Sequence, residues 1–467
     1  MSRALLPHFR TDDAPSIYTL GRANHGNTLI SRLPNEILLM VISRIADDCF
    51  FSPEPETKRM RWIRILHVCR HWYQLGVGSS TLWCNATSTS SIACIKEVLH
   101  RSWGAPLATV HIPSICPNTL EAAVLLLGEA HRTKTLQVSI PYMYRAEVIR
   151  ALSSCGKMPA LKKLTVYIQG AIGTFSRLTH FFPFELPRLT VLSVQVLGGL
   201  GGMVRAPNLQ YLSVRRWEGA METLSEEHPV DVDDLVQALR SMPHLAELWM
   251  EGLQPSSTRF PSSHEERAHL PALQCLSLSG PAFPLAGLLN LISVPTTATA
   301  MLQWVLMSHD SGDASYLVDS ISGLFIEEDP RGRTKQRALR ALRLSDTGSG
   351  HCLSVEGSAT RDYAFDFTLV VAGVADEGTS HPVLKGLGRL IEQLPLSEVR
   401  SLHVMGNEAK DVLVPRSVRP VVDRLAAVPE ARRNFSAEDT ADTDGAIIHS
   451  IFPNLKSLQW SQGDLWD

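Results

Sequence analysis

A phrase that recurs along the chain constrains its fold more than any other feature. It reads Pro-x-Leu-x-x-Leu-x-apolar, and its second Leu falls at positions 164, 192, 212, 248, 276 and 458. The Pro ends a preceding helix, because it has no amide hydrogen and excludes the residue before it from the α region. The leucine phrase then predicts a strand. The chain is therefore expected to repeat a helix–strand unit every 20 to 36 residues.

Weaker copies of the phrase extend this pattern. They fit at Val110, Val138, Leu342 and Leu402, with a further pair near Val305 and Val370. Helical apolar stripes lie between several of the expected strands. These stripes are Leu120, Val124 and Leu127; Val148, Ile149 and Leu152; Leu235, Val236 and Leu239; and Leu384, Leu387, Leu390 and Ile391.

A single unit of this kind cannot bury its own apolar face, so neighbouring units are expected to stack. The pattern resembles the leucine-rich-repeat family, although the spacing is irregular and the family's asparagine is missing at most places. The resemblance implies an α/β fold: an irregular solenoid with a parallel sheet along one side. The alternative is that the phrases arise by chance in a leucine-rich α/β domain.

The N-terminal stretch 29–86 is rich in Leu, Ile and Trp. One helical stripe is formed by Leu33, Ile37, Met40, Val41 and Ile45, with Pro34 where the helix begins. A second helix-like run follows, with apolar residues at Trp62, Ile63, Leu66, Cys69, Trp72 and Tyr73. So short a stretch cannot bury all of this apolar surface by itself, which favours a partner.

Three motifs in this stretch occur in a fixed order: Leu33-Pro34-x-Glu36-Ile37-Leu38, then Val68-Cys69-Arg70-x-Trp72, then Leu82-Trp83. In that order they resemble an F-box. The resemblance implies a three-helix motif that docks on a Skp-type adaptor, which hangs from a cullin scaffold carrying a RING ubiquitin ligase. The positions it assigns to adaptor binding are Leu33, Pro34, Ile37, Leu38, Val68, Cys69, Trp72, Leu82 and Trp83.

One departure from the family is the segment Asp47 to Arg61, which is expected to form a long solvated loop between the first two helices. Such a loop is either a harmless insertion or a cover over the adaptor-binding surface. The alternative to the F-box is an ordinary pair of buried helices.

The expected domain organisation has three parts. Residues 1–28 form a flexible tail, 29–86 the F-box-like helical domain, and 87–467 the repeat region. Within the repeat region, polar stretches near 252–269, 327–337 and 429–446 predict exposed or disordered insertions.

Composition excludes several classes of protein. The net charge of −3 gives no reason to expect a nucleic-acid surface. Eight scattered cysteines without a CxxC favour a reducing compartment. No signal sequence or membrane helix is expected, so the prediction is a soluble protein of the cytoplasm, the nucleus or both.

No catalytic motif, metal site or cofactor site is predicted. His67-x-Cys69-x-His71 has metal-ligand residue types, but on one helix positions two apart diverge by about 200°. Gly198 to Gly202 lacks the order and the lysine of a phosphate loop, so a turn between repeats is expected there. A basic run, partly at helical spacing, is interpreted as a solvated face, with a phosphate or acidic partner as the alternative. It comprises Arg331, Arg333, Lys335, Arg337, Arg340 and Arg343.

The resemblances together imply a protein without enzymatic activity of its own: the substrate-recognition subunit of a Skp–cullin–F-box ubiquitin ligase. The alternative is a scaffold that binds the adaptor without ubiquitin transfer. Because side chains alternate along a strand, residues flanking the core leucines are expected to line a concave sheet and bind a protein substrate. This set is Lys163, Tyr167, Tyr211, Arg215, Glu247, Trp249, Glu251, Arg343 and His403. For Trp249, packing beneath the 252–269 loop is the alternative.

Overall fold

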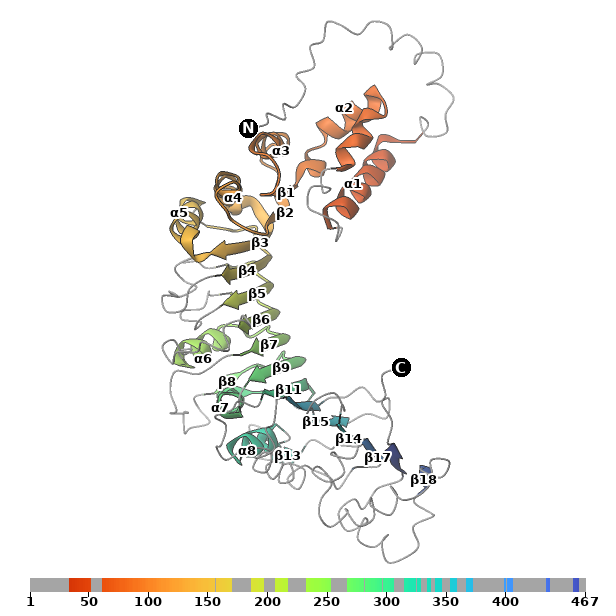
Figure 1. Cartoon of the computed structure of the whole chain (residues 1–467), viewed down its shortest axis with the longest axis vertical. Coiled ribbons are helices and arrows are strands. Elements are labelled where there is room, and N and C mark those ends of the chain that lie inside the picture. The colour runs from red at the N-terminus through yellow and green to blue at the C-terminus, as the bar shows by residue number, and fades with distance from the viewer. Residues whose placement is uncertain are drawn as a thin grey trace, which may run out of the picture. The chain divides into compact units, whose positions relative to one another are not determined.

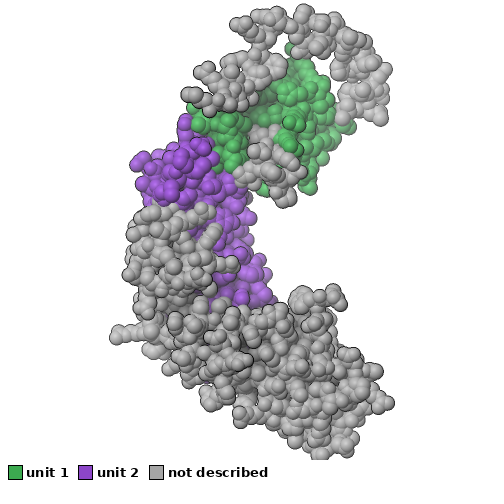
Figure 2. Space-filling view, in the orientation of Figure 1, with its two compact units in different colours: residues 1–108 green, residues 109–467 purple. Residues whose placement is uncertain are grey.

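The computed structural model describes a large part of the chain, with gaps. The described residues are 33–51, 61–155, 157–169, 186–196, 206–216, 232–252, 267–280, 282–295, 297–305, 315–324, 326–328, 334–336, 341–346, 353–358, 367–372, 399, 401–405, 434–436 and 457–461. The chain divides into two compact units, Met1–Ala108 and Thr109–Asp467 (Figure 2). They are called unit 1 and unit 2. The predicted tail, the glycine-rich run at 198–202 and the stripe at 384–391 lie outside the described residues.

The described part of unit 1 is a small, mainly helical bundle. Its elements are α1 (Asn35–Phe51), the 3₁₀ turn η3 (Arg61–His67), α2 (Arg70–Gly78), the 3₁₀ turn η4 (Ser80–Trp83), the short strand β1 (Asn85–Thr87) and α3 (Ile92–Arg101). The amides of Ile37 and Leu38 donate to the carbonyl of Pro34 at 3.1 Å, so the chain turns into α1 at this Pro as predicted.

Two local expectations for unit 1 were wrong. The segment 47–61 is not a loop throughout, because α1 continues through Phe51, and residues 52–60 lie outside the described ranges. The run from Trp62 to Tyr73 is not one helix either. It breaks where Cys69, in an extended conformation with φ −158° and ψ 167°, precedes α2. His67 and His71 therefore do not share a helix with Cys69, and the angular argument applied to these three residues does not hold.

The boundary between the units lies later than the predicted 86/87 division. The helix α3, assigned from sequence to the repeat region, belongs to unit 1 and packs against η4 and β1. Its start is capped by Ser91, whose hydroxyl accepts from the Cys94 amide at 3.2 Å. It ends before Gly104, which has φ +70°, a backbone conformation that favours glycine.

Unit 2 is built from strands with interspersed helices. Along its first half the elements are β2 (Leu107–Ile112), α4 (Leu120–Leu127), η5 (Ala130–Arg132), β3 (Thr133–Pro141), η6 (Tyr142–Tyr144), α5 (Arg145–Cys155), β4 (Lys163–Gln169), β5 (Val191–Val196), β6 (Tyr211–Arg216), α6 (Val232–Arg240), β7 (Glu247–Glu251), β8 (Ala268–His269), β9 (Cys275–Gly280), α7 (Ala282–Leu291) and β10 (Ile292–Ser293). β2 begins within unit 1, two residues before the boundary.

The second half of unit 2 contains mostly strands among its described residues. They are β11 (Thr299–Val305), α8 (Ser315–Gly323), β12 (Ile326–Glu328), β13 (Thr334–Gln336), β14 (Ala341–Asp346), β15 (Leu353–Ser358), β16 (Phe367–Ala372), β17 (Ser401–Met405), β18 (Asn434–Ser436) and β19 (Ser457–Ser461). No helix in the described part of the chain is long and apolar enough to cross a membrane.

A continuous sheet organises unit 2 (Figure 1). From β2 onwards its strand order is β2-β3-β4-β5-β6-β7-β9-β11-β16-β15-β14-β17-β19-β18. The pairs from β3 through β11 to β16 are parallel. This confirms a repeat-like α/β fold with a parallel sheet, and Figure 1 shows α4 to α7 following one another along one side of these strands.

The register of the sheet aligns the leucines of the recurring phrase. Leu164 pairs with Leu192, Leu192 with Leu212, Leu212 with Leu248, and Leu248 with Leu276. All five are fully buried. Two of the weaker copies follow the same rule, since Leu342 pairs with Leu402 and Leu402 with Leu458. The copy predicted at Val138 is two residues out of register, because Leu136 is the partner of Leu164, and Val370 pairs with Gln303 and not with Val305. For the five close copies from Leu164 to Leu276 the phrase therefore located the strands and their register correctly, even where the repeat length changes.

The Pro residues produce one kind of turn ahead of the strands. In each turn the residue before Pro accepts a hydrogen bond from the Leu amide three positions later, at 3.0 to 3.2 Å. Pro at the second position of such a turn fits its fixed φ. The acceptor–donor pairs are Met158–Leu161, Leu186–Leu189, Ala206–Leu209, Met242–Leu245 and Leu270–Leu273.

Beyond β11 the sheet departs from the expected all-parallel solenoid. β15 is antiparallel to both β14 and β16, and β18 is antiparallel to β19. All three stretches expected as exposed insertions contain strand residues. The strand β8, with its buried Ala268, lies at the end of 252–269, and β18 lies within 429–446. The antiparallel pair β12 and β13, from Ile326 to Gln336, overlaps the expected 327–337. The basic run is not helical where it is described, because Lys335 lies on β13 and Arg343 on β14.

Candidate functional site: two surfaces and a groove

The helix α1 carries apolar side chains on two opposite sides. Its core side consists of Leu38, Ile42, Ala46 and Phe50, all at most 5% exposed. A second set, named here the apolar face, consists of Leu33, which lies just before the helix, and of Ile37, Met40 and Val41 on it; these four are 39% to 66% exposed. At about 100° per residue the centres of the two sets lie on roughly opposite sides of the helix. The apolar face is therefore not needed to close the core of unit 1.

The predicted adaptor-binding residues divide into two groups. Leu33, Pro34, Ile37 and Val68 are exposed, with Val68 at 64%, and Cys69 and Trp72 are half-buried. The remaining residues, Leu38, Leu82 and Trp83, are buried in the core. These three cannot contact a partner without unfolding, so their assignment to adaptor contact is corrected: they hold the domain together.

The sheet of unit 2 has one face that is not part of the apolar core. On β7 the residues Leu248 and Met250 are buried while Glu247, Trp249 and Glu251 are half-buried, as the alternation predicted. Register places Tyr211, Ser213 and Arg215 of β6 directly beside these three. The polar face is defined here as the outward positions of β4 to β7. Its members from the predicted set are Lys163, Tyr167, Tyr211, Arg215, Glu247, Trp249 and Glu251.

Charged groups frame Trp249 on the polar face. Its indole Nε1 donates a long hydrogen bond of 3.4 Å to Oε2 of Glu247 on the same strand. Arg215 Nε lies 3.7 Å from Oε2 of Glu251, its register partner, and both side chains are about half exposed. An exposed pair of this kind contributes at most about 1 kcal/mol to stability. The arrangement offers an aromatic surface bordered by both signs of charge, which suits a protein partner.

Two further outward positions of the polar face, outside the predicted set, have little access to solvent. Thr165 and Ser213 point outward but are buried, at 8% and 1% exposure. Ser213 lies in register beside the much larger Trp249, which leaves a short side chain little access to solvent. Arg343 and His403 are register partners on β14 and β17, so the sequence correctly placed both on neighbouring strands; their side chains lie outside the described set.

On β9, the strand next to the polar face, Cys275 lies in register with Glu247 of β7. Burial, and secondarily the Glu247 carboxylate, raise the pKa of the Cys275 thiol. It is therefore held in the neutral form, which is a poor nucleophile. Among the described residues no group of three or more His, Cys, Asp or Glu side chains could hold a metal ion.

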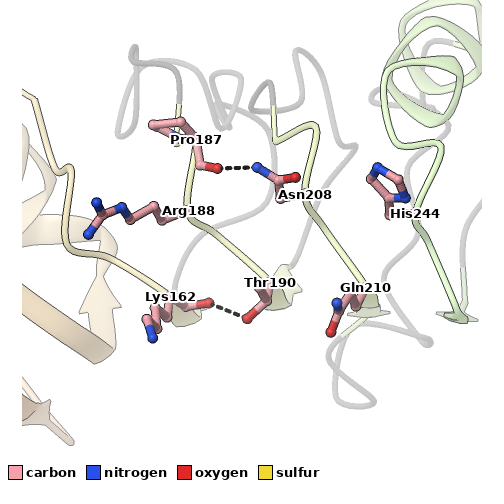
Figure 3. Close-up of a pocket in the computed structure, with 7 residues that line it drawn as sticks. All are labelled: Lys162, Pro187, Arg188, Thr190, Asn208, Gln210 and His244. Carbon is pink, nitrogen blue, oxygen red and sulfur yellow. Dashed lines mark hydrogen bonds between the residues drawn. The ribbon is translucent and has the colours of Figure 1, made fainter.

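Sequence reasoning missed a groove at the starts of the strands β4 to β7. It has a volume of about 700 Å³ and is lined by Lys162, Pro187, Arg188, Thr190, Asn208, Gln210 and His244. Figure 3 shows two rows: Pro187, Asn208 and His244 on the turns, and Lys162, Thr190 and Gln210 next to the strands. The signal was present in the recurring phrase, because Arg188, Asn208 and His244 all occupy the position after Pro.

The chain matches no protein-family model, and its sequence has no significant similarity to any curated protein.

Proposed function

We propose that this chain is the substrate-recognition subunit of a Skp–cullin–F-box type ubiquitin ligase, with unit 1 binding the adaptor and the sheet of unit 2 binding a protein substrate. The observation that carries the proposal is the apolar face of α1. Three large apolar side chains are exposed on α1, and that of Leu33 is exposed just before it, while the opposite side of the helix already fills the core. Two of the four, Leu33 and Ile37, belong to the first F-box-like motif, and the other two motifs follow it in order.

In this proposal the protein acts by proximity. The adaptor-bound unit 1 fixes the chain to the ligase, and a protein held on the polar face is kept near the ubiquitin-charged conjugating enzyme. Holding two reactants together raises their effective concentration, so no catalytic group is required of the chain itself. The repeat-like sheet suits this role, because stacked strands present one extended binding surface.

The adaptor-binding prediction is tested with Leu33→Ala/Ile37→Ala. Both residues are 39% exposed, so burying the remaining surface against a partner is worth about 0.6–1.2 kcal/mol each. The pair should weaken binding of purified Skp-type adaptor by about tenfold, measured by calorimetry. Met143→Ala, which truncates a 73% exposed side chain in unit 2, is the matched control. Unchanged adaptor affinity in the double variant would end the F-box interpretation.

The polar-face prediction uses Arg215→Ala/Trp249→Ala. Because both side chains reach the surface of the sheet, this variant should lose a bound protein while retaining adaptor affinity. Leu33→Ala/Ile37→Ala should show the reverse pattern. Quantitative mass spectrometry of proteins that co-purify with each variant and with wild type measures both effects. If no protein is lost specifically from Arg215→Ala/Trp249→Ala, the polar face is not the substrate surface.

A further inference from the structure

The groove at the starts of β4 to β7 is basic, although the chain as a whole has a net charge of −3. Its described lining includes Lys162, Arg188 and His244, and none of the described lining residues carries a carboxylate. All three basic side chains are exposed. In Figure 3 the Arg188 side chain extends to the same side of the groove as Lys162, while His244 lies at the opposite end. Positive charge thus concentrates toward the β4 end.

The neutral side chains of the groove have a different role, because they hold the turns in place. Asn208 Nδ2 donates to the carbonyl of Pro187 at 2.6 Å, and Thr190 Oγ1 donates to the carbonyl of Lys162 at 3.1 Å (Figure 3). By contrast, the side-chain nitrogens of Lys162, Arg188 and His244 form no hydrogen bond or ion pair with any described residue. The turns are therefore fixed, and the basic groups remain available to a ligand.

The spacing of the basic groups indicates the shape of that ligand. They belong to turns that precede parallel neighbouring strands, from β4 at one end to β7 at the other. Neighbouring strands are about 4.8 Å apart, so the groove spans roughly 14 Å across four strands. An extended chain covers about 3.3 Å per residue, so four or five residues would cross the groove. A single small anion could reach only one end of it.

We infer that this groove binds an extended acidic peptide segment, with carboxylates held by Lys162 and Arg188 and the end of the segment contacting His244. The groove lies on the turns ahead of the strands, apart from the outward positions that define the polar face. The inference relies on the proposed function only in attributing the peptide to a protein bound by the chain.

The test measures binding of a fluorescein-labelled penta-glutamate peptide to the full-length chain by fluorescence anisotropy. Lys162→Glu/Arg188→Glu should weaken binding at least about tenfold, because each reversal replaces an attraction with a repulsion of similar size. Lys162→Gln/Arg188→Gln should weaken it less, and added salt should weaken wild-type binding. A labelled penta-glutamine peptide should not bind measurably.

The matched control is Lys96→Glu/Arg150→Glu. These exposed residues lie on α3 and α5, away from the groove lining, and the variant has the same net charge as Lys162→Glu/Arg188→Glu. It should bind the acidic peptide like wild type. The melting temperature of every variant is also measured, and a value equal to that of wild type shows that the fold is retained.

Three results would overturn the inference: no binding of the acidic peptide by wild type, equal loss in the control variant, or equal binding of the neutral peptide. Inorganic phosphate serves as the competitor. Complete displacement of the peptide by an equal concentration of phosphate would assign the groove to a small anion and reject the peptide. The affinity of Lys162→Glu/Arg188→Glu for the adaptor is measured in parallel and should equal that of wild type. A failure of the groove to bind the peptide can then be distinguished from a failure of the proposed function, which would appear as absent adaptor binding in wild type.

Discussion

Replacing Trp83 by Ala is expected to lower the free energy of unfolding of unit 1 by about 3–5 kcal/mol. Trp83 is 4% exposed, and its ring packs edge-on against Trp62 with centroids 5.2 Å apart. The Arg101 guanidinium lies 4.6 Å from its ring centroid. Its Nε1 donates at 2.9 Å to the carbonyl of Gly76, in the last turn of α2 where carbonyls lack intrahelical partners. Truncation removes all of these interactions at once.

Hydrogen exchange on the full-length chain, read at the amides of α1, α2 and α3, measures this loss. Trp83→Phe keeps much of the ring but loses the bond to Gly76, so its cost should be much smaller, with the lost bond itself worth about 1 kcal/mol. Trp103→Ala is the matched control, because Trp103 is 79% exposed in the same unit and should change stability by less than about 0.5 kcal/mol. Equal effects for Trp83→Ala and Trp103→Ala would contradict the packing described for unit 1.

Comparing Trp83→Ala with Leu33→Ala/Ile37→Ala also separates two roles of residues in the F-box-like motifs: packing the core of unit 1 and, in the proposed function, contacting the adaptor. Trp83→Ala should weaken adaptor binding indirectly, with increased exchange throughout unit 1. Leu33→Ala/Ile37→Ala should weaken it directly, with exchange unchanged, since exposed side chains leave no cavity when truncated. The sequence motif could not make this distinction, because it assigned core and surface positions to one set.

The register of the parallel sheet was predictable because its signal is local. Each Pro fixes a turn whose hydrogen bond closes on the following Leu, and the strand begins directly after that turn. The leucine at a fixed distance from Pro then pairs with its counterpart in the next copy, whatever the length of chain between them. For this reason Leu192 and Leu212 pair correctly despite a repeat of only 20 residues.

The two sides of α1 show what periodicity leaves undetermined. The stripe from Leu33 to Val41 was recognised as apolar, and Leu33 and Ile37 in it were assigned to a partner, but no separate core side was predicted for this helix. The core of unit 1 is instead formed by Leu38, Ile42, Ala46 and Phe50. When a helix has apolar residues on two sides, each side shows helical periodicity, so periodicity alone does not tell which side is buried. Only the packing of η3 and α2 against α1 determines which side is buried.

The strands β14 to β16 could not be placed from sequence for a different reason. Of these three strands β16 comes last in the sequence but lies next to β11, while β14 comes first and lies next to β17. That order reverses the chain order through two antiparallel pairings, and pairing between distant segments carries no local signal. The groove was missed similarly, since it forms only when turns from four strands are brought side by side.

The second large effect is expected from Leu248→Ala, which should destabilise unit 2 by about 2–5 kcal/mol. Leu248 is fully buried, and register places it between Leu212 on β6 and Leu276 on β9, which are also fully buried. Truncation therefore leaves a cavity in the middle of a row of packed leucines, where neighbouring strands tied by hydrogen bonds on both sides cannot close in to fill it.

The strands in which Leu248→Ala increases hydrogen exchange test the repeat-like architecture. Stacked units interact mainly with their neighbours, so hydrogen exchange should rise first in β6, β7 and β9, then fall off toward β3, and stay unchanged in unit 1. Val124→Ala, at a 37% exposed position on α4, is the control and should leave exchange in these three strands unaltered. A uniform rise over unit 2 and unit 1 alike would mean that the chain unfolds as one cooperative block, and the nearest-neighbour description of its sheet would have to be abandoned.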